Sequence, residues 1–274
     1  EGTNNLKNIT DAKNQTYLTL TYDNFDRVET QKYGEGTFYF SYNAQQKITR
    51  LTDRKGHLTE WQFNDNGTPL SKKEYTYGLH PGEPQYYQTV YIYNADKELT
   101  EIGYPIGNRI KYKYDDKGNL LEIRRISHLG ESDILTTFTY EPRYNFIKTI
   151  QDPRNNVTTY VYDYENPVYG SEAGNLMKII YPTVKSQAIE TEFAYNSYGQ
   201  VEAVTDPNEN VTRYEYYPIT GYLKNIITGY GFLNYTSEMG YDDVGNVTSI
   251  KDPRQNTTTF IYNALNYLTK TISA

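Results

Sequence analysis

The chain has 274 residues, a net charge of −7 and no cysteine. The acidic balance argues against a nucleic-acid partner and against binding to an anionic membrane surface, and the absence of cysteine excludes a disulfide framework and thiolate chemistry. Tyrosine occurs 32 times, whereas apolar residues make up only 37% of the chain. A tyrosine ring packs while its hydroxyl keeps a polar partner, so this composition favours a thin, sheet-rich, extended body over a deep globular core.

Two kinds of membrane-directing segment are missing from the sequence. No apolar run approaches the roughly 20 residues that a transmembrane helix needs. The first residues do not form a basic and then apolar leader, so we expect any signal segment to lie outside this sequence.

In chain order, residues 1–16 are polar and poorly patterned, and they are predicted to form an N-terminal tail or a partial strand. Residues 17–274 are predicted to form a single repeat domain without a dividing linker. Its first signal is Tyr or Phe followed by Asp or Asn, recurring at intervals of roughly twenty residues. The copies are Tyr22-Asp23, Tyr42-Asn43, Phe63-Asn64, Tyr93-Asn94, Tyr114-Asp115, Tyr162-Asp163, Tyr195-Asn196, Tyr241-Asp242 and Tyr262-Asn263, with Tyr140-Glu141 and Tyr216-Tyr217 as further copies in longer gaps.

The second signal is a pair of aromatic residues two apart at the end of each repeat. Residues two apart in a strand share a face, so these rings are predicted to form two ladders along one face of a continuous antiparallel sheet. The pairs are Phe40/Tyr42, Trp61/Phe63, Tyr75/Tyr77, Tyr91/Tyr93, Tyr112/Tyr114, Phe138/Tyr140, Tyr160/Tyr162, Phe193/Tyr195, Tyr214/Tyr216 and Phe260/Tyr262.

The third signal is a pair of aliphatic residues three apart after each turn. These segments are too short and lack the caps of a helix. In a strand, a spacing of three puts the side chains on opposite faces, so either both faces are covered there or a β-bulge re-aims one side chain. The pairs are Ile48/Leu51, Leu99/Ile102, Leu120/Ile123, Ile147/Ile150, Leu176/Ile179, Val201/Val204, Leu223/Ile226 and Val247/Ile250.

Turns and loops punctuate these strands. An Asp-Pro turn with Asn four residues after the Asp occurs at residues 152–156, 206–210 and 252–256, with a weaker copy at 53–56. Proline fixes the backbone angle that such a turn needs, and Asn tolerates the left-handed conformation that closes it. Residues 78–84, 165–174 and 182–188 are predicted to be longer loops. The sequence thus predicts an all-β fold, a repetitive strip of antiparallel hairpins.

Two stretches, Tyr114–Leu120 and Tyr241–Val247, resemble the YD repeat of Rhs proteins. The same repeat occurs in the B and C components of Tc toxins, in wall-associated bacterial proteins and in teneurins. The resemblance covers residues 17–272, although the turn after Tyr42 lacks the glycine of the motif. It implies a β-sheet strip that spirals into a hollow shell.

In bacterial members of this family the shell encloses a C-terminal toxin domain that self-cleavage releases. The present sequence contains no cleavage motif, toxin domain or attachment region, so we expect it to be a fragment of a larger shell. The resemblance implies a bacterial protein that is secreted or displayed on the cell surface. Its partners would be further shell repeats of its own chain and an enclosed toxin or other cargo.

Candidate chemical sites are few. His57, His80 and His128 have no metal-ligand spacing and are interpreted as loop residues. The carboxylate pairs Asp115/Asp116 and Asp242/Asp243 lack the rest of a calcium loop, so they are interpreted as turn caps. The Asn-x-Ser/Thr sequences are interpreted as products of the turn pattern and not as glycan sites; they start at Asn8, Asn14, Asn66, Asn156, Asn210, Asn234, Asn246 and Asn256.

We therefore predict no catalytic, cofactor-binding or metal-binding residue, and no cofactor. The leading hypothesis is a structural, non-catalytic segment of a shell that encapsulates a toxin or other cargo. The alternative is an extracellular adhesion or carbohydrate-binding module, in which Trp61 is the candidate ring for stacking on a sugar. An enzyme, such as a glycoside hydrolase, is a third hypothesis, but no pair of carboxylates stands out as its acid and base.

Overall fold

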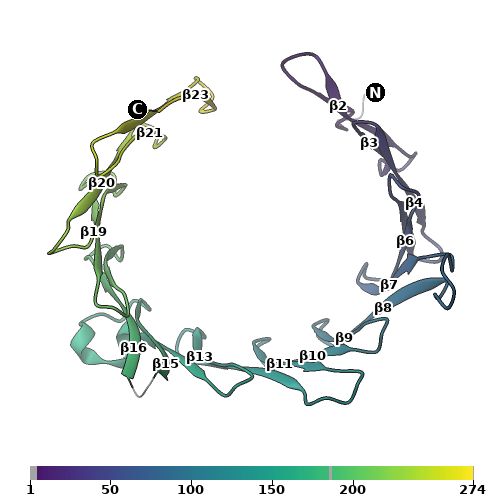
Figure 1. The fold of residues 1–274 in the computed structure, drawn as a ribbon, viewed down its shortest axis with the longest axis horizontal. Helices are drawn as coiled ribbons and strands as arrows, with labels where there is room; N and C mark the ends of the chain where they lie inside the picture. Colours follow the sequence, from purple (N-terminus) through teal and green to yellow (C-terminus); the bar gives the residue numbers. More distant parts are fainter. Residues whose placement is uncertain (1–4, 185–186, 274) are drawn as a thin grey trace. The chain divides into compact units, whose positions relative to one another are not determined.

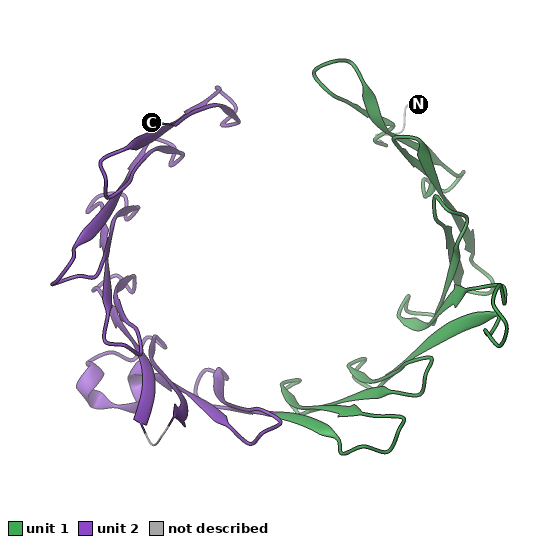
Figure 2. Cartoon of the chain, in the orientation of Figure 1, with its two compact units in different colours: residues 1–136 green, residues 137–274 purple. Residues whose placement is uncertain are grey.

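The computed structural model describes residues 5–184 and 187–273, which hold 23 strands and two short 3₁₀ helices (Figure 1). The chain divides into two compact units, residues 1–136 and 137–274 (Figure 2). Each unit is a meander in which every strand pairs antiparallel with the next one along the chain.

Unit 1 begins with a short strand inside the predicted tail, Asn8–Thr10, which pairs with the second strand. The strands are β1 (Asn8–Thr10), β2 (Thr16–Tyr22), β3 (Val28–Tyr33), β4 (Gly36–Asn43), β5 (Ile48–Thr52), β6 (Leu58–Phe63), β7 (Pro69–Tyr75), β8 (Tyr86–Tyr93), β9 (Leu99–Gly103), β10 (Arg109–Tyr114) and β11 (Leu120–Ile126). Strand β12 (Ile134–Tyr140) crosses the boundary between the units and pairs with β13.

Unit 2 continues the pattern and carries both helices. Its elements are β13 (Ile147–Gln151), β14 (Val157–Tyr162), η1 (Asp163–Glu165), η2 (Pro167–Tyr169), β15 (Leu176–Val184), β16 (Gln187–Tyr195), β17 (Val201–Thr205), β18 (Val211–Tyr216), β19 (Leu223–Thr228), β20 (Tyr235–Tyr241), β21 (Val247–Lys251), β22 (Thr257–Tyr262) and β23 (Leu268–Ile272).

The strands of each unit lie in one layer, with no second sheet or helix layer packed on them (Figure 1). Most strand residues are therefore half-buried. Among the described residues Tyr162, 8% exposed, is the only apolar side chain that is buried. The predicted absence of a deep core and the predicted all-β hairpin strip are both confirmed.

A β-bulge explains the aliphatic spacing of three. In the β20–β21 pair, Met239 lies opposite Ile250 and Tyr241 lies opposite Val247, with a register shift between them. Three residues of β20 thus span four residues of β21, and both aliphatic side chains reach the face that carries the tyrosine. The same shift occurs in the pairs β8–β9, β10–β11, β12–β13, β14–β15, β16–β17 and β18–β19. Of the two alternatives, the bulge is the one realised in these repeats.

One repeat hairpin, formed by β4 and β5, has no bulge. Strand β4 pairs with β5 in unbroken register, so Asn43 opposes Ile48 and Phe40 opposes Leu51. Residues 44–47 form the turn of this hairpin. The bulge does not depend on a turn glycine, because the turns after Tyr93 and Tyr262 have no glycine and their strand pairs have the bulge.

The predicted ring ladders need correction. The aromatic pairs stand on alternate strands, and the strand between them presents the aliphatic pair: Phe193 opposes Val204, and Val204 opposes Thr212. The stripe on this face, here called the ring face, is thus built of ring–aliphatic contacts and not of ring–ring contacts. The pair Tyr75/Tyr77 is not a strand step either, because β7 ends at Tyr75 and Tyr77 lies in a loop with φ +58°.

The longer loops are partly confirmed. Residues 78–84 connect β7 to β8, and residues 165–174 connect β14 to β15 around η2. The loop predicted at residues 182–188 is wrong, because residues 182–184 belong to β15 and residues 187–188 to β16, while residues 185–186 lie outside the described part. A proline at the end of an edge or hairpin strand is tolerated, so Pro182 gave a false loop signal.

Both kinds of predicted turn share one construction. The Asp115 carboxylate accepts hydrogen bonds from the backbone N–H groups of Lys117 and Asn119, both at 2.9 Å, and from the Asn119 amide at 2.9 Å. Asp242, Asp152 and Asp206 are bonded to the residues two and four positions later in the same way. Hydrogen bonds from the Asn side chain and the backbone hold the pKa of each of these four carboxyl groups below its usual value.

Two turn glycines offer a matched test of backbone strain. Gly67 (φ +76°) and Gly245 (φ +92°) occupy the same turn position, but an added Cβ would be in open space at Gly67 and 2.6 Å from the Tyr222 hydroxyl at Gly245. We expect Gly67→Ala to lower the unfolding free energy by about 1–2 kcal/mol, the cost of left-handed backbone. Gly245→Ala should cost about 1–3 kcal/mol more, because Tyr222 must move. Urea unfolding of the two variants checks this, and equal costs would contradict it.

Candidate functional site: a tyrosine clasp and a buried carboxylate cluster

In several repeats the motif tyrosine joins its repeat to the previous one. Its hydroxyl donates a hydrogen bond to the carbonyl oxygen of the first aliphatic residue of the preceding repeat, the residue at the β-bulge. The bonds, here called the tyrosine clasp, are Tyr114 to Leu99 (2.9 Å), Tyr162 to Ile147 (2.8 Å), Tyr195 to Leu176 (2.9 Å), Tyr216 to Val201 (2.7 Å) and Tyr262 to Val247 (3.0 Å). A bulge disrupts the ladder at this point, so the clasp gives the bulge carbonyl a donor.

Four of the clasp hydroxyls, those of Tyr114, Tyr162, Tyr195 and Tyr216, have raised pKa values and so remain donors. Burial and the nearby carboxylates of Glu141 and Glu165 together raise the pKa of Tyr162 to about 12. Burial also raises the pKa of Tyr114, Tyr195 and Tyr216. The clasp therefore keeps its donor throughout the neutral and moderately alkaline range.

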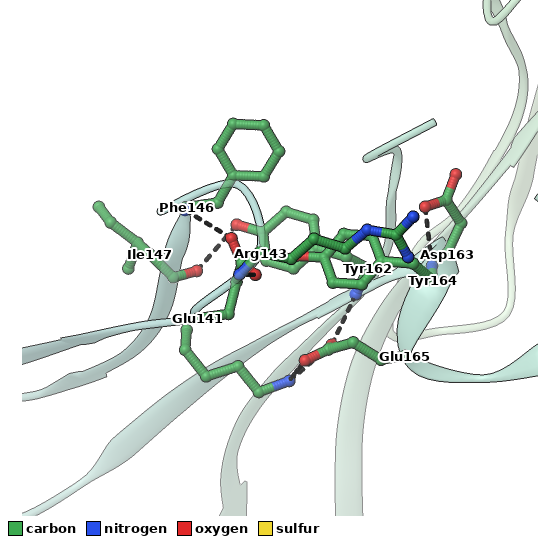
Figure 3. Close-up of polar contacts among 9 residues, drawn as sticks. Glu141, Arg143, Phe146, Ile147, Tyr162, Asp163, Tyr164 and Glu165 are labelled. Atoms are coloured by element: carbon green, nitrogen blue, oxygen red, sulfur yellow. Dashed lines mark hydrogen bonds and ion pairs between the residues drawn. The ribbon is translucent and has the colours of Figure 1, made fainter. Parts of the chain in front are cut away.

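The most buried polar groups of unit 2 gather where the repeat departs from its pattern. Glu141 stands where the motif has Asp, and its side chain is 3% exposed. Its Oε1 accepts from the backbone N–H groups of Tyr144 and Phe146, both at 2.8 Å, and its Oε2 accepts from Arg143 N–H at 2.7 Å (Figure 3). The longer Glu side chain thus closes a longer turn than Asp does in the other repeats.

Opposing effects set the pKa of Glu141. Burial alone would raise it, but the hydrogen bonds from the backbone of Phe146, Arg143 and Tyr144 outweigh burial and lower it to about 2. The buried Tyr164 hydroxyl lies beside the carboxylate; its alignment falls outside hydrogen-bond geometry, yet its dipole still favours the ionised form. Burial and this carboxylate both raise the pKa of Tyr164. Glu141 is therefore an anion over the whole physiological range.

Four rings surround this carboxylate. Tyr144 stacks on Phe146 with centroids 5.6 Å apart, Phe146 contacts Tyr162 at 5.2 Å, and Tyr162 stacks on Tyr164 at 5.9 Å. The Arg143 guanidinium lies over the rings of Tyr144 and Tyr164, at 5.3 and 5.2 Å from their centroids. Such offset rings and cation–π contacts exclude water from the turn.

Two further carboxylates fix the insertion at residues 163–175. Asp163 is fully buried, and it accepts from the backbone N–H groups of Tyr164 (2.8 Å), Gly174 (3.0 Å) and Ala173 (3.1 Å). Glu165 accepts from the backbone N–H of Tyr162 at 2.9 Å and from Lys148 Nζ at 2.6 Å. Asp163 and Glu165 thus tie both ends of the insertion to the sheet.

This cluster is built for packing and not for acid–base chemistry. The carboxylate oxygens of Glu141, Asp163 and Glu165 are already bonded to backbone N–H groups or to a lysine. A general base needs a free lone pair within reach of a substrate, and a general acid needs a pKa near the working pH. In the described part of the chain no three His, Cys, Asp or Glu side chains gather in a way that could hold a metal ion.

Trp61 and the three histidines belong to unit 1, whereas this cluster belongs to unit 2. Trp61 is half-buried in the middle of β6, opposite Thr49 and Lys72, on the ring face. His57 Nδ1 is 3.0 Å from Asp53 Oδ2, and His128 Nδ1 is 2.7 Å from Asn108 Oδ1. The backbone N–H of His80 contacts Glu83 in the loop before β8. The three histidines therefore lie in three separate turns or loops.

Sequence reasoning did not single out Glu141, Asp163 or Glu165. Two signals were present. Glu141 replaces Asp directly after a motif tyrosine, and Tyr162-Asp163 is followed by a loop of about ten residues with Pro and Gly instead of by the short turn. A long connection after a motif residue indicates an insertion. The Asp or Glu that follows the motif tyrosine then has to bind more backbone N–H groups than it does in a short turn.

The geometry defines a class of protein: a single-layered antiparallel repeat sheet in which recurring tyrosines clasp the bulge of the repeat before their own. Residues 241–274 match the family model described as RHS Repeat. A search of curated proteins gave no match.

Solved structures share the fold over nearly the whole chain. A TcdB2-TccC3 structure without the hypervariable C-terminal region matches at 18% identity and a TM-score of 0.68, covering 94% of this chain and 14% of that chain. A TcdB2-TccC3-Cdc42 structure matches at 17% and 0.67, covering 93% and 14%. A Tc holotoxin pore of Photorhabdus luminescens, mutated in TccC3, matches at 18% and 0.66, covering 92% and 13%.

Residues 241–274 thus match the Rhs repeat, and the likeness to these structures over nearly the whole chain shows that the chain has their fold. It spans about one seventh of the length of the structures that it matches. No helix in the described part of the chain is long and apolar enough to cross a membrane.

Proposed function

We propose that this chain is a structural segment of the wall of a shell that encloses another polypeptide. The observation that carries the proposal is the match of 94% of the chain to the TcdB2-TccC3 structure, at a TM-score of 0.68. The enclosed polypeptide, a toxin or another cargo, would be kept from proteases and from the producing cell. The protein would act after export.

The internal construction supports a wall function. The repeats contact their neighbours through ring–aliphatic contacts and, in several of them, through a clasp. Such a sheet extends by adding repeats, so its stability is a sum of neighbour terms and its reach grows with repeat number. Neither property requires a catalytic group, and the proposal includes none.

The position of Trp61 favours packing over sugar binding. Trp61 takes the place on the ring face that the tyrosines and phenylalanines take in other repeats, half-buried between β5 and β7. A carbohydrate site needs an exposed ring with hydrogen-bonding groups gathered around it. The wall function therefore accounts for Trp61 without a ligand.

Limited proteolysis of the protein as its cell produces it tests the proposal. We expect one polypeptide segment outside the repeats to survive proteinase K under native conditions and to be digested after unfolding in urea. A variant carrying Tyr162→Ala should lose this protection, because the wall is weakened at its best-packed clasp. Digestion of every segment outside the repeats at the same rate under both conditions would contradict containment.

A further inference from the structure

Unit 1 carries an open apolar hollow that the wall function does not use. It has a volume of about 760 Å³ and lies where the turn after β9 and the connection after β11 meet β8 and β10. Tyr87, Ile106 and Ile134 line it and are 38%, 61% and 49% exposed. Exposed apolar side chains gathered in a concavity mark a binding surface more often than isolated ones do.

An arginine stands inside this apolar lining. Arg125 lies opposite Ile110 in the β10–β11 ladder, on the ring face, where other repeats carry rings or aliphatic residues. It is exposed and has no ion pair with any described residue of unit 1, while Glu74 at the other end of the hollow is held by Lys72 at 2.8 Å. A ligand with a carboxylate would meet an unpaired guanidinium there, and Arg is the side chain best shaped to bind a carboxylate.

The connection beside the hollow offers free backbone groups. Residues 130–133 belong to no strand, helix or turn, and within unit 1 they make no backbone–backbone hydrogen bond. Glu131 and Ser132 of this segment line the hollow. Unpaired N–H and C=O groups next to apolar pockets are the arrangement by which proteins bind extended peptides.

We propose that this hollow binds an extended peptide segment whose apolar side chains flank a carboxylate. The apolar side chains would cover Tyr87, Ile106 and Ile110, the carboxylate would pair with Arg125, and the peptide backbone would bond to residues 130–133. Glu131, the one unpaired acid on the rim, disfavours a second carboxylate at that end. The proposal goes beyond the wall function and does not depend on it.

Fluorescence anisotropy with synthetic peptides tests the proposal. The probe is the fluorescein-labelled peptide Gly-Ile-Val-Asp-Phe-Thr-Gly, compared with the same peptide carrying Lys for Asp. We expect saturable binding of the Asp peptide and binding of the Lys peptide that is about tenfold weaker or more. Ile106→Asp should weaken binding of the Asp peptide about tenfold, and Arg125→Glu should reverse the preference between the two peptides.

A matched variant separates the hollow from general surface effects. Ile219→Asp changes an isoleucine that is 98% exposed in a loop of unit 2, and it should leave binding unchanged. Thermal unfolding shows whether each variant remains folded, and Ile106→Asp changes a turn residue that packs on little. Absence of binding to the wild-type chain, or equal loss in Ile106→Asp and Ile219→Asp, would overturn the proposal. Saturable binding of sodium decanoate without binding of either peptide would overturn it as well, in favour of a single-chain carboxylate ligand.

Discussion

Tyr162→Ala is expected to lower the free energy of unfolding by about 3–5 kcal/mol, the range for removing a buried aromatic side chain. Tyr162 is the only buried apolar side chain in the described part of the chain, and its ring contacts those of Phe146 and Tyr164. Its hydroxyl also donates the clasp to Ile147. Removal therefore leaves a cavity and leaves the bulge carbonyl without a donor.

Two further variants divide this effect into its parts. Tyr162→Phe keeps the ring and removes the clasp, so it should cost only about 1 kcal/mol, the usual net value of one hydrogen bond. Tyr198→Ala removes a ring that is 82% exposed in a neighbouring turn, and it should stay within about 0.5 kcal/mol of the wild type. Urea unfolding followed by circular dichroism measures all three. A cost for Tyr162→Ala no larger than that for Tyr198→Ala would show that the clasp ring stabilises nothing.

The loss should also be local. In a sheet held by neighbour contacts, each repeat interface contributes its own term, and weakening one interface leaves the others intact. Hydrogen exchange of the Tyr162→Ala variant should therefore accelerate first in β13 to β15, the strands that the clasp joins. A single-layered sheet can tolerate this because no central core couples all repeats at once.

The repeat can be predicted from the sequence far better than the register in which the strands pair. The spacing of three between Val247 and Ile250 is visible in the sequence, but the choice between a bulge and two covered faces depends on which residues the partner strand opposes to them. The partner Tyr241 is two residues from Met239, and only that mismatch requires the bulge. The bulge forms after Tyr93, whose turn has no glycine, and is absent after Tyr42, whose turn also has none, so the turn residues alone do not predict it.

Pattern matching fails where a residue of the right type stands outside a strand. Tyr75 and Tyr77 have the spacing of a ring pair, yet Tyr77 has a positive φ and continues into the loop that ends before β8. Glu141 fails in the opposite direction, because a change from Asp to Glu looks conservative but reaches three backbone donors in a longer turn. In both cases the connection between two strands is longer than in the regular repeat. The structure of such a connection cannot be predicted from a short repeat motif.

The charge state of Glu141 carries the second large expected effect. Glu141→Gln should lower the free energy of unfolding by about 2–3 kcal/mol at pH 7, because hydrogen bonds to a charged group are worth more than neutral ones. The glutamine amide nitrogen would also turn a donor toward backbone N–H groups that now point at an acceptor. Because Glu141 is 3% exposed, water has little access to replace the lost acceptor.

The pH dependence of this variant follows from the sign of the pKa shift. The pKa of Glu141 is about 2 in the folded chain and about 4.3 in an unfolded chain. The folded state therefore gains stability from the ionised carboxyl above pH ~4.3, and loses this gain as the pH falls toward 2. The stability difference between the wild type and Glu141→Gln should shrink over that window.

Comparison of variants isolates this carboxyl from the others. Asp152, Asp206 and Asp242 also have lowered pKa values, so the wild type loses stability in acid for several reasons at once. Those groups are unchanged in Glu141→Gln, and their contributions cancel in the difference. Glu209→Gln, at an exposed turn position, should follow the wild-type curve at every pH. The contradicting outcome is a difference in unfolding free energy between the wild type and Glu141→Gln that stays constant from pH 6 to pH 2. A neutral carboxyl would then close the turn as well as the anion does, and Glu141 would act through its shape and not through its charge.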